Sequence, residues 1–143
     1  MTSTSSNDMA LARPLCRAIL AFVLTVAGGG AAAEVWVKVG ENEKFRAYYD
    51  PASMRKEGNT VKMWDMFDYR TALSTPAGKK YLSVKRHTEY DCKQGRTRVY
   101  ELSYHSENLS KGEVVAASAV NFDWSVVAKG SSDELLLDSA CGK

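Results

Sequence analysis

The sequence predicts a single α+β domain at residues 34–143, in which a six-stranded antiparallel sheet carries a short C-terminal helix on one face. Three observations lead to this fold class. Short runs rich in β-branched and aromatic residues are separated by turn residues. A helical pattern appears only near the C-terminus. Two cysteines are placed so that a disulfide would join the helix to the sheet.

Residues 1–33 have the organisation of a secretory signal peptide. Arg13 and Arg17 precede an uncharged run at residues 18–33 that ends in Gly and Ala. This order of basic, apolar and small residues is typical of an exported chain, and we expect cleavage after Ala33. The run is shorter than the roughly 20 apolar residues that a membrane anchor needs. Met9 is an alternative initiator methionine, because translation from it would give the signal peptide a shorter basic N-terminal segment.

The three cysteines divide into one that is removed and two that remain. Cys16 precedes the apolar run instead of following it, so a lipid-modified cysteine is not predicted. Cys92 and Cys141 then form the only pair in a chain sent to an oxidising compartment, which indicates a structural disulfide. A redox pair would usually read Cys-x-x-Cys, and a metal site would need more ligands nearby.

Six β-rich runs follow the signal peptide, and each break between them has a turn signal. Asp50-Pro51 starts a turn, Gly58 and Gly95 supply positive φ or a hairpin, and Gly112 ends another connection. Connections this short favour antiparallel neighbours. The predicted strands are residues 35–39, 45–49, 60–69, 81–92, 97–105 and 114–122.

The predicted strand 81–92 shows two different faces, because successive side chains of a strand point to opposite sides. One face carries Leu82, Val84, Arg86, Thr88, Tyr90 and Cys92. The other carries Tyr81, Ser83, Lys85, His87, Glu89 and Asp91. Since the first face is the more apolar and includes Cys92, we expect it to lie toward the core.

A short helix is predicted after Ser131, which is a good N-cap and has Glu134 three residues later, as in a capping box. The helix is too short to persist alone in water, so it must dock on the sheet. A bridge from Cys141 to Cys92 would place its apolar side on the Cys92 face. That side carries Leu136, Leu137, Ala140 and Cys141.

Composition excludes several classes of protein. The chain has 143 residues, of which 45% are hydrophobic and 25% charged, so it is not a disordered or multi-span membrane chain. Its formal net charge is only +2. Because basic and acidic residues are interleaved, nucleic acid is not an expected partner.

The order of several residues along the whole predicted domain resembles that of the surface-adhesin protein E family of small exported bacterial proteins. These are Trp36, Tyr48-Tyr49-Asp50-Pro51, Ser53, Val61-Lys62-Met63-Trp64, Asp68-Tyr69, Glu89-Tyr90-Asp91-Cys92, Trp124, Gly130-Ser131 and Cys141. The resemblance implies a six-stranded antiparallel sheet with a disulfide-tethered helix, often in a dimer. It also implies binding of host matrix or plasma proteins. The misplaced Cys16 departs from a lipid-anchored adhesin.

The predicted domain offers little for catalysis, so we expect no enzyme, no metal and no cofactor. His87 and His105 are its near-neutral bases. Ser106, next to His105, would point to the opposite side of the strand and is poorly placed as a nucleophile. No phosphate loop, His-x-x-x-His or calcium loop occurs in the sequence. Two carboxylate pairs have the chemistry of an acid and a base, Asp65 with Asp68 and Glu89 with Asp91.

A cluster of basic residues in or near the predicted hairpin 81–105 is the candidate binding surface. It would suit a polyanion or an acidic peptide. The alternative is an ordinary surface of mixed charge, because Glu89, Asp91 and Glu101 share the hairpin. The basic residues are Lys79, Lys80, Lys85, Arg86, Arg96 and Arg98.

Aromatic residues lie in the same strands. Four tyrosines would suit an interface or the core beneath the helix, namely Tyr81, Tyr90, Tyr100 and Tyr104. We expect Trp36, Trp64 and Trp124 to be core anchors and not ligand-stacking residues.

The sequence therefore predicts an exported, non-catalytic binding protein of the bacterial periplasm or cell surface, whose partner is a protein or a polyanion. A homodimer would protect the two open edges of the sheet. The alternative is a soluble periplasmic module that encloses a small apolar ligand or serves in envelope stress.

Overall fold

The structure, a computed structural model, describes residues 33–119 and 122–143. The predicted signal peptide at residues 1–33 lies outside the described residues, apart from Ala33 itself. No helix in the described part of the chain is long and apolar enough to cross a membrane.

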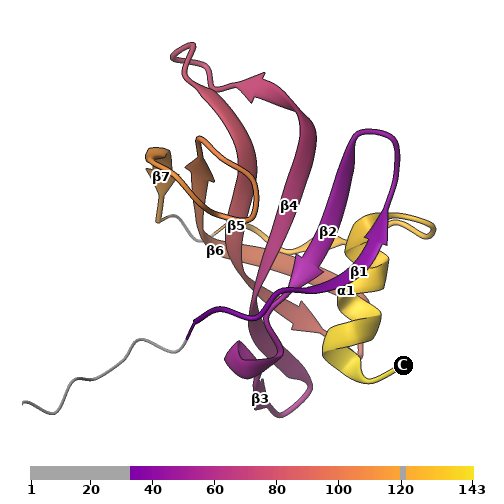
Figure 1. Cartoon of the computed structure of the whole chain (residues 1–143). Coiled ribbons are helices and arrows are strands. Elements are labelled where there is room, and N and C mark those ends of the chain that lie inside the picture. The colour runs from indigo at the N-terminus through magenta and orange to yellow at the C-terminus, as the bar shows by residue number, and fades with distance from the viewer. Residues whose placement is uncertain (1–32, 120–121) are drawn as a thin grey trace, which may run out of the picture. The chain divides into compact units, whose positions relative to one another are not determined.

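One antiparallel sheet forms the frame of the domain (Figure 1). Its main path runs β1-β2-β4-β5-β6-β7, so neighbours in space are close in sequence. β3 pairs with the start of β4, and β8 pairs with the start of β6. The strands are β1 (Val37–Glu41), β2 (Phe45–Tyr49), β3 (Arg55–Glu57), β4 (Thr60–Ser74), β5 (Lys80–Asp91), β6 (Arg96–His105), β7 (Val114–Ser118) and β8 (Ser125–Val126).

The six predicted runs all form strands of the main path, but the predicted count of six is wrong because the described residues form a sheet of eight strands. β3 has 3 residues and β8 has 2, which is too short for alternation to be read from the sequence. β4 is also longer than predicted, since it continues to Ser74 through an irregularity after Asp68. The predicted turn at Asp50-Pro51 begins the 3-10 helix η1 (Pro51–Ser53).

The helix α1 (Ser132–Cys141) begins as its sequence predicts. The Ser131 Oγ accepts a hydrogen bond from the Glu134 backbone N–H at 3.2 Å. The Glu134 carboxylate accepts in return from the N–H of Gly130 at 2.6 Å, one residue earlier than in a standard capping box. Gly142 ends the helix with a φ of 69°, a left-handed conformation that glycine adopts without strain.

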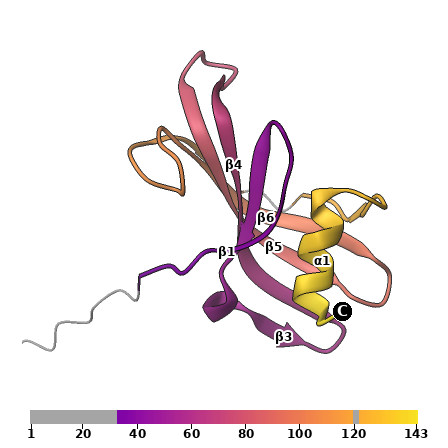
Figure 2. The same cartoon turned by 45° about the vertical axis from the view of Figure 1, so that its right-hand side comes forward.

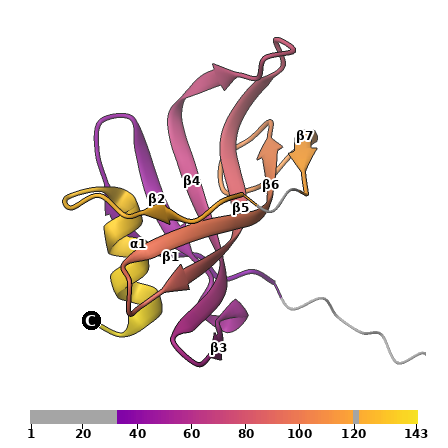
Figure 3. The same cartoon turned by 180° about the vertical axis from the view of Figure 1, so that it is seen from behind.

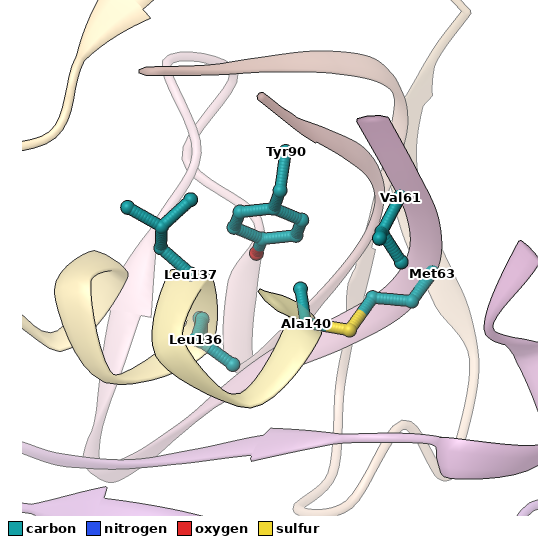
Figure 4. Packing of buried hydrophobic residues seen from close by; sticks show 6 residues of the cluster. All are labelled: Val61, Met63, Tyr90, Leu136, Leu137 and Ala140. Atoms are coloured by element: carbon teal, nitrogen blue, oxygen red, sulfur yellow. The ribbon is translucent and has the colours of Figure 1, made fainter. Parts of the chain in front are cut away.

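The core lies between α1 and one face of the sheet (Figure 4). β1 approaches the helix closely at Gly40, where an added Cβ would lie 2.5 Å from the Cδ1 of Leu135. The buried residues include Leu136, Leu137 and Ala140 of the predicted apolar side of the helix and Tyr90 of the predicted inner face of β5, so these residues face the core as predicted. The buried residues of this core are Val61, Met63, Tyr90, Leu136, Leu137 and Ala140.

Two tethers hold α1 on this face. The predicted disulfide between Cys92 and Cys141 is confirmed, with Cα atoms 5.6 Å apart. The second tether is polar: Arg86 of β5 contacts Asp65 of β4 at 2.5 Å and Asp133 of α1 at 2.8 Å. Burial opposes the charge of the guanidinium, but the negative charge of Asp65 raises the pKa of Arg86 above its ordinary value. Arg86 is therefore a permanent cation beneath the first turn of the helix.

Replacing both cysteines, Cys92→Ser with Cys141→Ser, is expected to lower the free energy of unfolding by about 4 kcal/mol, because the bridge restricts the unfolded chain. The two residues are 49 positions apart in sequence. Urea denaturation followed by circular dichroism measures the change. Reductant should lower the stability of the wild type and leave the double variant unchanged. Equal stability of both proteins would contradict the tether.

Arg86→Leu is expected to lower the free energy of unfolding by about 3–5 kcal/mol, because Asp65 would be left buried without its counter-charge. Asp65 has no exposed surface. Lys80→Leu, at an exposed position of the same strand, is the matched control and should change stability by less than about 0.5 kcal/mol. Equal losses in the two variants would show that Arg86 is not a tether.

Candidate functional site

The side of the sheet that α1 does not cover is the candidate functional site, and we call it the open face. Lys62 and Trp64 alternate along β4 with the core residues Val61 and Met63, so they point away from the helix. The strands β4, β5 and β6, which carry the open face, are seen from behind in Figure 3.

Rings from three strands and one loop line up across the open face. Trp64 lies directly opposite His87, and their rings stack with centroids 4.8 Å apart and planes 20° apart. The ring of Tyr100 follows, 6.0 Å from that of His87. The guanidinium of Arg98 then connects Tyr100 to Trp124, at 5.1 and 4.5 Å from their ring centroids. We call Trp64, His87, Tyr100 and Trp124 the aromatic row.

A bulge in β6 is needed to build this row. His87 pairs with Glu101, but the next residue, Thr88, pairs with Val99, so Tyr100 is an extra residue without a partner on β5. In a regular strand Tyr100 and Glu101 would point to opposite sides. The bulge instead lets both side chains line one hollow on the open face.

Cationic side chains lie over the rings of the row. The Lys85 ammonium is 4.3 Å from the centroid of Trp64. The Lys62 ammonium is 5.4 Å from the centroid of Tyr100, and the Arg96 guanidinium is 4.6 Å from that of Trp124. Contacts of this kind at partly exposed sites contribute about 0.5–1 kcal/mol each. They hold the long side chains in fixed positions.

Each of these basic groups also has a carboxylate partner, so the open face is close to charge balance. Its field therefore offers little long-range attraction for a polyanion. The ion pairs are Lys62 with Glu57 at 3.6 Å, Lys85 with Glu34, Arg96 with Asp91 at 3.0 Å, and Arg98 with Glu89 at 2.8 Å. The Glu101 carboxylate lies 3.8 Å from the His87 ring.

Two hollows flank the row and share the side chains of Glu101 and Ala119. The first has a volume of about 330 Å³ and is also lined by Lys62, His87 and Tyr100. The second, of about 350 Å³, lies between Trp64 and β7. Small residues at the end of β7 leave this space open: Ala117, Ser118 and Ala119.

Glu89 anchors one end of the aromatic row. Its carboxylate accepts hydrogen bonds from the Tyr100 hydroxyl at 2.5 Å and from the Arg98 Nε at 2.8 Å. Burial acts to raise the pKa of Glu89, but these hydrogen bonds outweigh it and lower the pKa below its ordinary value. Glu89 is therefore an ionised clamp and not a proton donor.

The sequence model of the surface-adhesin protein E family matches residues 36–142. The chain belongs to this family. A crystal form II structure of Haemophilus influenzae protein E has a TM-score of 0.54 at 13% identity and covers 78% of this chain and 100% of its own. A second structure of that protein has a TM-score of 0.52 at 12% identity, covering 76% and 94%. A comparison with curated proteins gives no match.

At such low identity the likeness to Haemophilus influenzae protein E shows a shared fold alone. The family resemblance drawn from the order of aromatic residues and cysteines is confirmed. The surface-adhesin protein E model covers nearly all of the predicted domain at residues 34–143, so one family accounts for the strands, the helix and both cysteines.

The six predicted basic residues do not lie together on one surface of the fold. Lys85, Arg96 and Arg98 lie on the open face, against rings and carboxylates. Arg86 lies on the opposite face, beneath α1. Lys79 and Lys80 lie at the turn between β4 and β5. The alternation of side chains along β5 already places Lys85 and Arg86 on opposite faces. The carboxylates that pair with them, however, could not be predicted from their positions in the sequence.

The candidate acid and base groups have structural partners. His87 is stacked in the aromatic row. His105 is buried, and its Nε2 lies 2.9 Å from the Oγ of Ser103 and not from Ser106. Burial lowers the pKa of His105, and the positive charge of Lys85 lowers it further. Within the described residues, no group of three His, Cys, Asp or Glu side chains is arranged to hold a metal ion.

The members of each predicted carboxylate pair bind different partners in the fold. Asp65 lies under the helix with Arg86. Asp68 accepts hydrogen bonds from Arg46, from the side chain of Asn108 and from a backbone N–H of the 106–113 loop. Glu89 and Asp91 share the open face but bind different arginines. These carboxylates fix strands and loops in place.

The expectation that the tryptophans anchor the core is wrong. Trp36, Trp64 and Trp124 are all half-buried, and none belongs to the core beneath α1. Trp64 and Trp124 belong to the aromatic row, and Trp36 borders a separate hollow with Tyr48. The core uses Met, Val, Leu, Ala and one tyrosine instead.

Glu89→Gln is expected to weaken the dependence of stability on acid. The folded-state pKa of Glu89 lies below its unfolded value of about 4.3, so its contribution is complete above that pH and is lost as the pH falls through the folded pKa. Urea denaturation between neutral pH and about pH 3 measures this. The variant should be less stable at neutral pH and lose less on acidification. Glu113→Gln, at an exposed position, should follow the wild type; a parallel loss in Glu89→Gln would contradict the clamp.

Proposed function

We propose that this chain is an exported, non-catalytic binding protein of the bacterial envelope, which holds a matrix or plasma protein of a host on its open face. Membership of the surface-adhesin protein E family supports binding as the general activity. The single observation that carries the proposal is the aromatic row with its two adjoining hollows on a sheet face that the helix leaves uncovered.

The chemistry of the row suits a protein partner better than a polyanion. Trp, Tyr and Arg are enriched at the energetic centres of protein interfaces, where large rings lose water on contact. The basic groups of the open face already have carboxylate partners, so charge would orient a protein instead of concentrating a polyanion. Fixed rings and paired charges lose little side-chain freedom on binding.

The proposal includes location and assembly. The signal peptide at residues 1–33 would direct the chain out of the cytoplasm, and the family supports the bacterial cell surface as its place of action. The sheet ends at β1 and β7, and each of these edge strands has backbone groups available for pairing. Contact between two copies through an edge would give the homodimer.

A second candidate is a periplasmic protein that binds a small ligand. The observation that favours it is the size of the two hollows, about 330 and 350 Å³, which lies in the range of small-molecule sites. Native mass spectrometry of gently purified protein distinguishes the two functions. A retained small molecule that Trp64→Ala releases would favour this second candidate.

Trp64→Ala combined with Tyr100→Ala is expected to weaken binding to plasma or matrix proteins by at least about tenfold, because the row would lose two of its rings. Surface plasmon resonance against immobilised plasma proteins and solubilised matrix measures the affinity. Leu135→Ala, on the exposed side of α1, is the control and should bind as the wild type does. Undiminished binding by the double variant would remove the open face from the proposal.

A further inference from the structure

A second surface lies where the β4–β5 hairpin runs past the end of β2 (Figures 1 and 2). The pairing of β2 with β4 ends at Phe45 opposite Tyr69, and one more bond follows from the Arg70 N–H to the Lys44 carbonyl at 2.9 Å. Beyond this point Leu73 and Ser74 pair with Tyr81 and Lys80 of β5, and no strand among the described residues pairs with the other edge of residues 71–74. Their other edge has backbone groups available for a further strand.

An apolar cavity of about 250 Å³ adjoins this free edge, and we call it the hairpin slot. Leu73 is 39% exposed at its rim. Burial raises the pKa of Tyr69, so its hydroxyl stays protonated. The slot is lined by Glu43, Lys44, Phe45, Tyr69, Thr71 and Leu73.

Edge-to-face aromatic contacts extend from the slot across the sheet. The ring of Phe45 lies 5.9 Å from that of Tyr69, which lies 5.8 Å from that of Tyr81. Tyr81 in turn lies 4.8 Å from Tyr104. The floor of the slot is therefore continuous with a tyrosine cluster, whose rings offer area and whose hydroxyls offer hydrogen bonds.

The walls of the slot are fixed before any partner arrives. Arg70 of β4 donates to the Asn42 carbonyl at 3.0 Å and to the Glu41 carboxylate at 2.8 Å, which ties the hairpin to the β1–β2 turn. At the hairpin tip, Thr75 and Lys79 exchange two hydrogen bonds, at 2.9 and 3.1 Å. A partner would not need to order these turns, so little of its binding energy would be lost to them.

Charge distinguishes the slot from the open face. Within the described residues, Lys44, Lys79 and Lys80 have no carboxylate within ion-pair distance. The Lys80 ammonium donates to the Ser74 hydroxyl at 2.9 Å. The slot is lined by one acid, Glu43, and one of these lysines, Lys44, while Lys79 and Lys80 lie at the tip of the same hairpin. The surroundings of the slot are therefore net positive, whereas the open face is balanced.

We propose that the hairpin slot binds an extended acidic segment of a protein partner, which pairs with residues 71–74 as an added strand and places an apolar side chain beside Leu73. Backbone pairing would supply affinity, and the slot and the lysines would select the side chains. The proposal rests on the proposed function in that the chain acts by binding protein. It adds a second contact of different chemistry and names the kind of segment that is recognised.

The test uses a synthetic, fluorescein-labelled peptide in which Glu alternates with Leu and Thr, and the full exported chain with its disulfide. Fluorescence anisotropy should show saturable binding that weakens as salt is raised. A peptide with Lys in place of Glu should bind at least about tenfold more weakly. N-methylation of alternate backbone amides should abolish binding, because it removes the donors of an added strand. Equal binding of either modified peptide would overturn the proposal.

Variants locate the site. Leu73→Asp should weaken peptide binding at least about tenfold, and Lys79→Glu with Lys80→Glu about five- to tenfold. The matched control, Lys129→Glu with Lys143→Glu, makes the same charge change at two other exposed positions and should leave binding unchanged. Thermal melting shows whether each variant folds. If Leu73→Asp does not fold, the variant Lys79→Glu with Lys80→Glu serves as the test. Wild-type affinity in the slot variants would overturn the proposal.

Other occupants would give different results. If Leu73→Asp converts a dimer into a monomer in light scattering, the slot is filled by a second copy and the proposal falls. If native mass spectrometry shows a small molecule that this variant loses, the proposal also falls. Matrix-protein binding that depends on Trp64 but not on Leu73 would sustain the proposed function and reject the slot. If the chain captures the peptide but binds no matrix protein, the slot is sustained and the proposed function is rejected.

Discussion

The docking of α1 on one face of the sheet is the constraint on which the rest of the structure depends. The helix is only 10 residues long, so it relies on its contacts with the sheet. A covalent bridge at Cys141 holds its end, and the ion pair between Arg86 and Asp133 holds its beginning. With both ends fixed, the apolar side of the helix commits one face of the strands to the core. The opposite face is then left for contact with other molecules.

The distribution of charge follows from this division. On the helix side, a buried guanidinium needs a buried carboxylate, and Arg86 with Asp65 satisfies that need. On the open face, cations lie over rings and beside carboxylates, so they act as rigid parts of a surface of low net charge. The lysines near the hairpin slot differ from these, because Lys44, Lys79 and Lys80 have no carboxylate within ion-pair distance among the described residues. Sequence proximity alone therefore does not tell which basic residues can attract a partner.

Much of the fold could be predicted from the sequence, because its signals are local. Alternation along β5 placed Tyr90 toward the core, and Ser131 marked the start of the helix. The bridge could be predicted because only two cysteines follow the signal peptide. The site was less accessible. The bulge at Tyr100 turns this side chain to the open face. Because the bulge is defined by the pairing of β6 with β5, no local sequence pattern reveals it. The tryptophans were misplaced because size and hydrophobicity do not distinguish a core position from a half-buried position on the surface.

The position of α1 after all the strands in the sequence affects how the chain folds. Nearly all sheet pairings join strands that are close in sequence, so hairpins can form as soon as their residues are available. The helix, however, follows every strand, and its contacts with β1 close the longest loop in the domain. Until it arrives, the sheet exposes Val61, Met63 and Tyr90 to water. A nascent or translocating chain is thus most in need of protection by chaperones during the interval before its last ten helical residues emerge.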